Sequence, residues 1–288
     1  MSNMSGKTKR RGIKKKSYFN IVYYVPLIIG AMIILIPIIW MSFGSFRPGP
    51  EIFAYPLSLW PKEFTIRNYL TLFETVPFAR NFLNSAIATG GFLILTLFLC
   101  SLAGFAFAKY RFPLRNTLFI ILLGSMMIPI HVILIPLFLL MLKIGWVNTL
   151  YALIIPLAAH PIGLFFMRQY MLSIPSELMD AARIDGCSEF GIFYKIVLPV
   201  CKPALGALAV LLGLEQWNHF LWPLVVLSSS EKLTLPIAIA NLIEIFEEKP
   251  EFGVIFAGCL LSILPILILF LFLQKYFMSG ALRGAIKG

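Results

Sequence analysis

Long runs of apolar residues constrain this chain more than any other feature of its sequence. A helix needs about 20 consecutive apolar residues to cross the hydrocarbon core of a bilayer. Six stretches of this kind cover residues 21–41, 85–107, 117–142, 150–167, 206–227 and 253–272. The runs are continuous, whereas the strands of a transmembrane β-barrel would alternate apolar and polar residues. We therefore predict an all-α polytopic membrane protein with six transmembrane helices.

The composition supports this class. Hydrophobic residues make up 59% of the chain and charged residues 13%, whereas soluble domains carry about 25% charged residues. The first run is too long for the apolar region of a cleaved signal peptide, so we expect it to be retained as a helix. The spans and short loops use nearly all of residues 1–288, which we treat as a single transmembrane domain.

Basic residues indicate the orientation of the spans. Most of the 24 Lys and Arg residues lie before the first run, around residues 109–115, between residues 168 and 202, and after the last run. Because Lys and Arg favour the cytoplasmic side, both termini are predicted to be cytoplasmic, with external loops at residues 44–84 and 228–252. We attribute the net charge of +11 to contacts with the lipid bilayer and expect no nucleic-acid partner.

A polar segment at residues 173–199 separates two apolar runs and is predicted to face the cytoplasm. It holds four of the chain's 13 carboxylates, including both aspartates. A short helix is expected here, with Ser173 or Ser176 as its cap, Pro175 at its start and Gly186 as its stop. Ser188 is the expected cap of a second short helix that ends before Pro199.

One face of the first short helix is predicted to meet a soluble partner. The spacing i, i+3, i+4 and i+7 places four residues on it: Leu178, Ala181, Ala182 and Asp185. Because the two alanine side chains are small, a groove on the partner could approach the backbone of this helix closely. An amphipathic helix lying on the bilayer is the alternative, but this stripe is too small and too acidic for that role.

The motif Asp180-Ala181-Ala182-x-x-Asp185-Gly186, followed by Ile196-Val197-Leu198-Pro199, resembles the E-A-A…G…I-x-L-P loop of ATP-binding cassette (ABC) importer permeases. Asp180 stands where that family usually has Glu. Further similarities, in Trp217-Asn218-x-Phe220 and in the closing segment from Lys275, indicate the carbohydrate-uptake subfamily and its MalG-like permease. The resemblance covers roughly residue 68 to the C-terminus.

This resemblance implies a mechanism and a set of partners. The partners would be a MalF-like second permease, two ATPase subunits and an extracytoplasmic sugar-binding protein, assembled in the bacterial inner membrane. The residues implied to couple this chain to an ATPase are Glu177, Asp180, Ala181, Ala182, Asp185 and Gly186. The chain itself would hold no catalytic residue, metal or cofactor, since the partner ATPase would use the ATP and Mg²⁺.

Polar residues in the fifth span are the candidates for a substrate path. At about 100° per residue, Glu215, Asn218, His219 and Trp222 project from one face. An ionisable side chain at this depth is costly, so Glu215 should face protein or a water-filled cavity. His131, near the middle of the third span, is added to the path. These groups would either contact sugar or only tie the fifth span to its neighbours, and the sequence leaves both open.

Two other classes of function compete with the importer. A proton-coupled secondary transporter could use Glu215 and the mid-membrane histidines, but such carriers often show inverted sequence halves, and none is apparent. An intramembrane enzyme would need a nucleophile with its base, and no recognisable motif surrounds the serines in the spans. Metal binding would need three or four converging ligands, and no spacing of this kind occurs.

Overall fold

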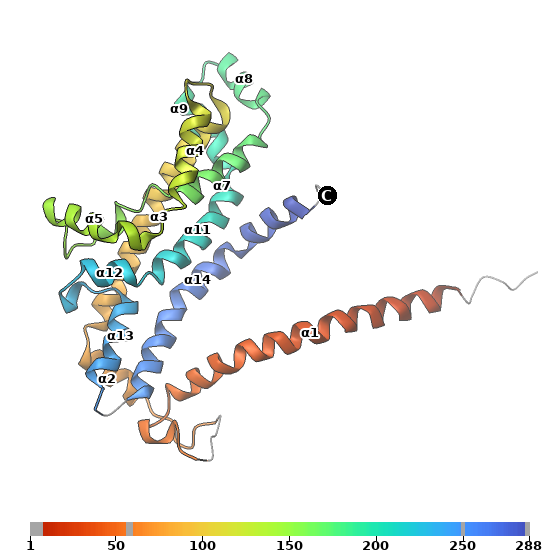
Figure 1. Cartoon of the computed structure of the whole chain (residues 1–288). Coiled ribbons are helices and arrows are strands. Elements are labelled where there is room, and N and C mark those ends of the chain that lie inside the picture. Colours follow the sequence, from red (N-terminus) through yellow and green to blue (C-terminus); the bar gives the residue numbers. More distant parts are fainter. Residues whose placement is uncertain (1–7, 56–59, 249–250, 286–288) are drawn as a thin grey trace, which may run out of the picture. The chain divides into compact units, whose positions relative to one another are not determined.

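A computed structural model describes residues 8–55, 60–248 and 251–285 (Figure 1). Within these ranges the chain is helical and has no strand, which confirms the predicted all-α class. The elements are α1 (Thr8–Gly44), η1 (Gly49–Glu51), α2 (Arg67–Thr75), α3 (Phe78–Lys109), α4 (Arg115–Ser125), α5 (Ile130–Lys143), α6 (Tyr151–Ile154), α7 (Pro161–Leu172), α8 (Glu177–Ile184), α9 (Glu189–Ile192), the π-helical turn η2 (Phe193–Val197), α10 (Leu198–Val200), α11 (Lys202–Trp217), α12 (Leu221–Val226), η3 (Ser230–Lys232), α13 (Leu235–Ile245) and α14 (Phe252–Ala285).

Three helices in the described part of the chain are long and apolar enough to cross a membrane unbroken. They include Tyr23–Gly44, Phe78–Lys109 and Phe252–Gln274, which match the first, second and last predicted spans. Two bent pairs raise the number to five if each pair is one span: Arg115–Met127 with Ile130–Lys143 at 99°, and Glu189–Val200 with Lys202–Trp217 at 74°. The predicted span at residues 150–167 is divided between α6 and α7.

Prolines explain two of these interruptions. Pro129 is extended, with ψ 144°, and separates α4 from α5. His160 is extended before Pro161, as expected for a residue whose α conformation is hindered by the following proline ring. In contrast, α1 continues through Pro37 and α14 through Pro265. A proline in an apolar run therefore does not by itself reveal whether the helix stops.

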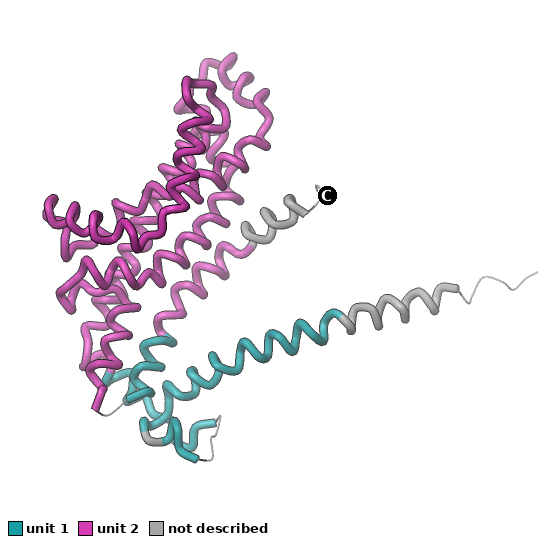
Figure 2. Tube along the Cα trace, in the orientation of Figure 1, with its two compact units in different colours: residues 1–71, 249–260 teal, residues 72–248, 261–288 magenta. Residues whose placement is uncertain are grey.

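The chain divides into two compact units, which Figure 2 colours separately. The larger unit, residues 72–248 and 261–288, is organised around α3, against which α7, α11 and α13 pack. Glycines allow the closest of these approaches. A Cβ on Gly104 would lie 2.9 Å from the Met167 Cβ, and one on Gly163 would lie 2.8 Å from the Cys100 Sγ. Small residues at helix contacts are typical of membrane bundles.

The segment predicted as the second external loop is more ordered than a loop. It contains α13, whose Leu235, Ile237, Ala238 and Leu242 are buried. Polar side chains of α3 hold its entry in place: Asn84 donates to the Leu233 carbonyl at 3.1 Å, and Ser85 Oγ accepts from the Leu235 amide at 2.8 Å. The sequence predicts a loop here because acidic residues follow the short apolar stretch of α13.

The smaller unit comprises residues 1–71 and 249–260. At its centre the buried side chain of Asn68 donates to the backbone carbonyls of Ser45 and Arg47, at 2.8 and 2.7 Å. Gly253 of α14 lies directly against this amide, since a Cβ there would be 2.4 Å from the Asn68 Nδ2. One asparagine thus fixes the turn that follows α1 and the start of α14.

Candidate functional site

The polar segment folds as predicted into two short helices, α8 and α9. The expected cap at the start of α8 is wrong, because Ser176 makes no side-chain capping bond and Ser173 Oγ instead donates back to the Tyr170 carbonyl at 2.7 Å. Glu177 and Asp180 do lie in the first turn, where carboxylates are favoured by the helix dipole. The start of α8 therefore depends on charge and packing instead of a hydroxyl cap.

Gly186 ends α8 as predicted. Its φ is +79°, a conformation open to glycine at little cost. The Gly186 amide donates to the Arg183 carbonyl at 3.0 Å and the Cys187 amide to the Ala182 carbonyl at 2.9 Å, which is the bonding pattern of a Schellman motif. Ser188 then caps α9 by accepting from the Gly191 amide at 3.2 Å, as predicted. The predicted end before Pro199 is wrong, because the helical stretch continues through η2 and α10 to Val200.

The exposed face of α8 differs from the predicted one. Met179 and Ala182 are 2% and 5% exposed and join the large hydrophobic core around Phe193 and Val197. Ala182 therefore packs inward, and the prediction that it shares an exposed stripe with Leu178, Ala181 and Asp185 is wrong. Met179 and Ala182, at i, i+3 spacing, lie on the side of α8 that packs against this core.

The exposed surface of α8 presents Leu178, Asp180, Ala181, Ile184 and Asp185. Ile184 is 87% exposed, an unusual position for a large apolar side chain outside a span. Phe190 of α9 is exposed as well. Apolar side chains rimmed by carboxylates are typical of a surface that binds another protein.

A cluster of charged and polar groups connects α8, α9 and the end of α3. Arg183 donates from Nη1 to Asp180 Oδ1 at 2.7 Å and from Nε to Glu189 Oε1 at 2.8 Å. Tyr110, the residue after α3, donates its hydroxyl to the other oxygen of Glu189. Hydrogen bonds from Arg183 and then Tyr110 lower the pKa of the Glu189 carboxyl to about 2. Burial, and then Glu189 itself, raise the pKa of Tyr110.

A second contact joins α3 to the start of the polar segment. Lys109 Nζ donates to the Ile174 carbonyl at 2.5 Å. Consecutive residues at the end of one long helix, Lys109 and Tyr110, thus bond the start of the segment and the first residue of α9. These two bonds connect the polar segment to the end of α3.

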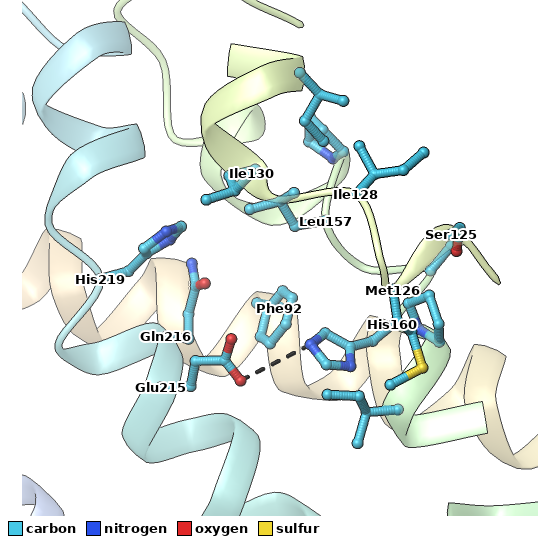
Figure 3. A pocket seen from close by; sticks show the side chains of 15 residues that line it. Phe92, Ser125, Met126, Ile128, Ile130, Leu157, His160, Glu215, Gln216 and His219 are labelled. Atoms are coloured by element: carbon cyan, nitrogen blue, oxygen red, sulfur yellow. Dashed lines mark ion pairs between the residues drawn. The ribbon is translucent and has the colours of Figure 1, made fainter. Parts of the chain in front are cut away.

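The helix interruptions border a cavity of about 570 Å³. Figure 3 shows its walls, which come from α3, the α4–α5 break, the segment before α7, and the end of α11. Most of the lining is apolar, as with Ile128, Ile130 and Leu157. The polar lining residues are Ser125 at the end of α4, His160 before α7, and Glu215, Gln216 and His219 at the end of α11. A mostly apolar cavity with a few convergent polar groups is typical of a small-molecule site.

Glu215 and His219 line this cavity, as predicted for groups facing a cavity. The carboxylate of Glu215 lies 3.8 Å from His160 Nε2, the interaction drawn as a dashed line in Figure 3. Gln216 was not among the predicted residues, yet it also lines the cavity while donating to the Leu153 carbonyl at 3.2 Å. Gln216 follows Glu215 within α11, and the predicted polar face did not include it.

Three residues of the predicted path do not belong to the cavity. Trp222 has no exposed surface and donates its indole N–H to the Ala152 carbonyl at 2.8 Å, so it is a core residue of α12. Asn218 turns back to the Leu214 carbonyl at 2.8 Å. His131 is exposed and does not line the cavity. The break between α11 and α12 removes the single helical face on which the prediction depended.

Comparisons with known proteins identify the family. Residues 100–281 match the model of the binding-protein-dependent transport system inner membrane component. The chain is 43% identical to the arabinooligosaccharides transport system permease protein AraQ of Halalkalibacterium halodurans over 261 residues, which are 90% of this chain and 93% of that protein. It is 34% identical to the lactose transport system permease protein LacG of Rhizobium radiobacter, covering 93% of this chain and 96% of that one.

A solved structure has the same fold. The crystal structure of a bacterial ABC transporter involved in the import of the acidic polysaccharide alginate contains a chain with a TM-score of 0.81 and 26% identity, covering 96% of this chain and all of that one. The family match over residues 100–281 includes the polar segment. With its apolar helices and its matched residues 100–281, the chain belongs to the family of inner membrane components of binding-protein-dependent transport systems, as a multi-pass ABC importer permease.

Proposed function

We propose that this chain is one permease subunit of an ATP-driven importer that moves a sugar or oligosaccharide into the cytoplasm by alternating access. The observation that carries the proposal is the exposed surface of α8, whose helix is stopped by Gly186 and bonded to the end of α3 through Arg183, Glu189 and Tyr110. A rigid helix with free apolar side chains is suited to receive motion from a soluble ATPase.

The proposal includes the topology. Six spans, with both termini and the segment at residues 173–199 on the cytoplasmic side, agree with the distribution of Lys and Arg. The α4–α5 pair and the α6–α7 pair each serve as one span with an interrupted middle. Such breaks are tolerated at membrane depth where they line a cavity, and the cavity around Glu215 borders both of them.

The proposal also includes the partners. A MalF-like second permease completes the path, two ATPase subunits bind and hydrolyse ATP with Mg²⁺, and an extracytoplasmic binding protein delivers the sugar. Relatives named for arabinooligosaccharides and lactose support a carbohydrate cargo. Within this assembly Leu178, Asp180, Ala181 and Asp185 would contact the ATPase, while Glu177 and Gly186 would set the start and the end of the helix. Ala182 would support them from the core.

Reconstitution of the complex in proteoliposomes tests the proposal. Uptake should require the binding protein and ATP together with all membrane subunits. Ala181→Arg, which adds a long side chain to the exposed face of α8, should abolish coupled uptake and weaken retention of the ATPase during purification. Glu244→Arg places the same side chain on an exposed position of α13 and should leave both unchanged.

A proton-coupled carrier would behave differently. Such a carrier would transport as an isolated chain, would respond to a proton gradient and would tolerate Ala181→Arg. Membership of the importer family does not favour this alternative. Purification of the chain alone with full transport activity would overturn the importer proposal.

A further inference from the structure

The charge of the cavity is set by one residue. Among its lining residues, all in the described part of the chain, Glu215 is the one carboxylate, and no Lys or Arg is present. The side chain of Glu215 is 66% exposed. It is therefore available to a molecule inside the cavity.

His160 does not neutralise this carboxylate. As the cap of α7, His160 accepts at Nδ1 from the Gly163 amide at 3.4 Å. An imidazole that accepts at Nδ1 is the neutral form, with its proton on Nε2. Nε2 lies 3.8 Å from Oε2 of Glu215, which is beyond a direct hydrogen bond. The pair consequently presents one net negative charge, an acceptor on Glu215 and a donor on His160.

This arrangement distinguishes sugars by charge. Hydroxyl groups of a neutral sugar can donate to the Glu215 carboxylate, and an ammonium group can do so more strongly. A cargo carboxylate at the same place would be repelled, and the apolar wall formed by Ile128, Ile130 and Leu157 reduces the screening of that repulsion. The described lining contains no Lys or Arg to offset it.

The fold alone does not determine this preference. The solved relative belongs to a transporter that imports an acidic polysaccharide, so helices arranged in this way are compatible with acidic cargo. Discrimination must then depend on individual side chains. We infer that Glu215, with His160 held beside it, makes the cavity of this permease reject acidic sugars and accept neutral or amino sugars. This inference rests on the proposed function.

Three derivatives of one transported oligosaccharide provide the test. Reduction at the reducing end gives a neutral alditol, oxidation gives an anionic aldonate, and reductive amination gives a cationic amino-alditol, all of one chain length with one opened ring. Uptake into proteoliposomes by the whole complex is measured for each. Each rate is normalised to the occupancy of the binding protein, titrated separately with the same compound, so that selection by the binding protein cancels.

The wild-type complex should take up the alditol at least about tenfold faster than the aldonate, and the amino-alditol at least as fast as the alditol. Glu215→Gln should reduce the alditol-to-aldonate ratio at least about threefold, because aldonate uptake rises relative to alditol uptake. Ser125→Asp adds a second carboxylate from the end of α4 and should widen the ratio. Glu231→Gln, on an exposed residue of η3 outside the cavity, should leave it unchanged.

A wild-type ratio near one overturns the inference, and so does a high ratio that Glu215→Gln leaves unaltered. If Glu215→Gln prevents assembly, Ser125→Asp decides the matter, because an unchanged ratio in that variant also overturns it. Absence of ATP-driven uptake for every derivative and for the parent sugar is a different result. It would contradict the proposed function itself.

Discussion

Arg183 donates two hydrogen bonds to the Glu189 carboxylate across the turn between α8 and α9. Nε lies 2.8 Å from Oε1, and Nη2 lies 3.2 Å from Oε2. Bidentate pairs of this kind fix direction as well as distance. Because Tyr110 donates to the same carboxylate, the pair also joins the loop to the end of α3. Glu189 is therefore the residue through which the two short helices and the long helix are held together.

The order of this loop should depend on pH in the acidic range. The pKa of Glu189 is about 2 in the folded chain, against about 4.3 for an unperturbed glutamate. A carboxyl group with a lowered folded pKa stabilises the fold above its unfolded pKa, and this stabilisation is lost as pH falls toward the folded value. We expect loop order to be constant from pH 8 to about 5.5 and to decline from about 4.5 toward 2.

The mobility of a nitroxide on Cys187 measures this order. Cys187 is partly exposed and lies between Gly186 and Glu189; changing Cys259 to Ala leaves it as the accessible thiol, since Cys100 and Cys201 are buried. In Glu189→Gln the label should already be mobile at pH 7, with no further change on acidification. Asp185→Asn, which alters a carboxylate outside the Arg183–Glu189 pair, should keep the acid transition. Persistence of that transition in Glu189→Gln would show that another group causes it.

Gly186 and Gly145 form a matched pair for testing the coupling role of α8. Both have positive φ, +79° and +75°, and a Cβ on either would meet nothing within 4 Å. Alanine at either position should therefore cost about 1–2 kcal/mol of stability through the backbone alone. Gly186→Ala should reduce ATP-driven uptake severalfold because it distorts the end of α8, whereas Gly145→Ala should lower the melting temperature similarly and preserve uptake. Equal losses of uptake would mean that α8 has no special role.

Local features of the loop were predictable because their causes lie within a few residues. Gly186 as a stop and Ser188 as a cap depend on bonds that span three to five positions along the chain. The orientation of α8 was harder to predict, since two apolar stripes compete on a helix of eight residues. Which of them faces inward is decided by the core around Phe193, and no spacing within α8 reveals that core.

The set of residues that line the cavity could not be predicted from the sequence. His160 and Glu215 have 54 residues between them in the sequence and lie 3.8 Å apart in the structure. His160 is in the extended break between α6 and α7, just before Pro161. Hydropathy gives the same signal for an interrupted span as for a continuous one, and Pro37 shows that proline alone is ambiguous. Asn218 and Trp222 were predicted to share one helical face with Glu215. That prediction is wrong because α11 ends at Trp217, before both residues.

The contact between α3 and α7 should tolerate no side chain at Gly104. A Cβ there would lie 2.9 Å from the Met167 Cβ and 3.0 Å from the Arg168 amide nitrogen, and neither atom can move without moving α7. Gly104→Ala should destabilise the protein by about 1–3 kcal/mol. Gly90→Ala lies on the same helix with nothing within 4 Å of its Cβ and should be neutral or slightly stabilising. Thermal unfolding in detergent compares the two, and equal midpoints would contradict this packing.

Gly253 and Asn68 should be strongly coupled. Gly253→Ala would place a Cβ 2.4 Å from the Asn68 Nδ2 and 2.7 Å from its Cγ, displacing the amide that bonds to the Ser45 and Arg47 carbonyls. Overpacking and loss of these buried bonds should together cost about 2–4 kcal/mol. Asn68→Ala alone should cost about 1–3 kcal/mol, because the two carbonyls lose their donor.

A double-mutant cycle measures this coupling. Asn68→Ala removes the atoms that a Cβ at position 253 would meet, so the double variant should be little less stable than Asn68→Ala alone. The interaction energy should then be about 1–3 kcal/mol in the favourable direction, within the range found for residues in contact. Gly30→Ala, whose Cβ would meet nothing within 4 Å, is the control, and its effect should add to that of Asn68→Ala. Simple additivity for Gly253→Ala and Asn68→Ala would mean that the two residues do not touch.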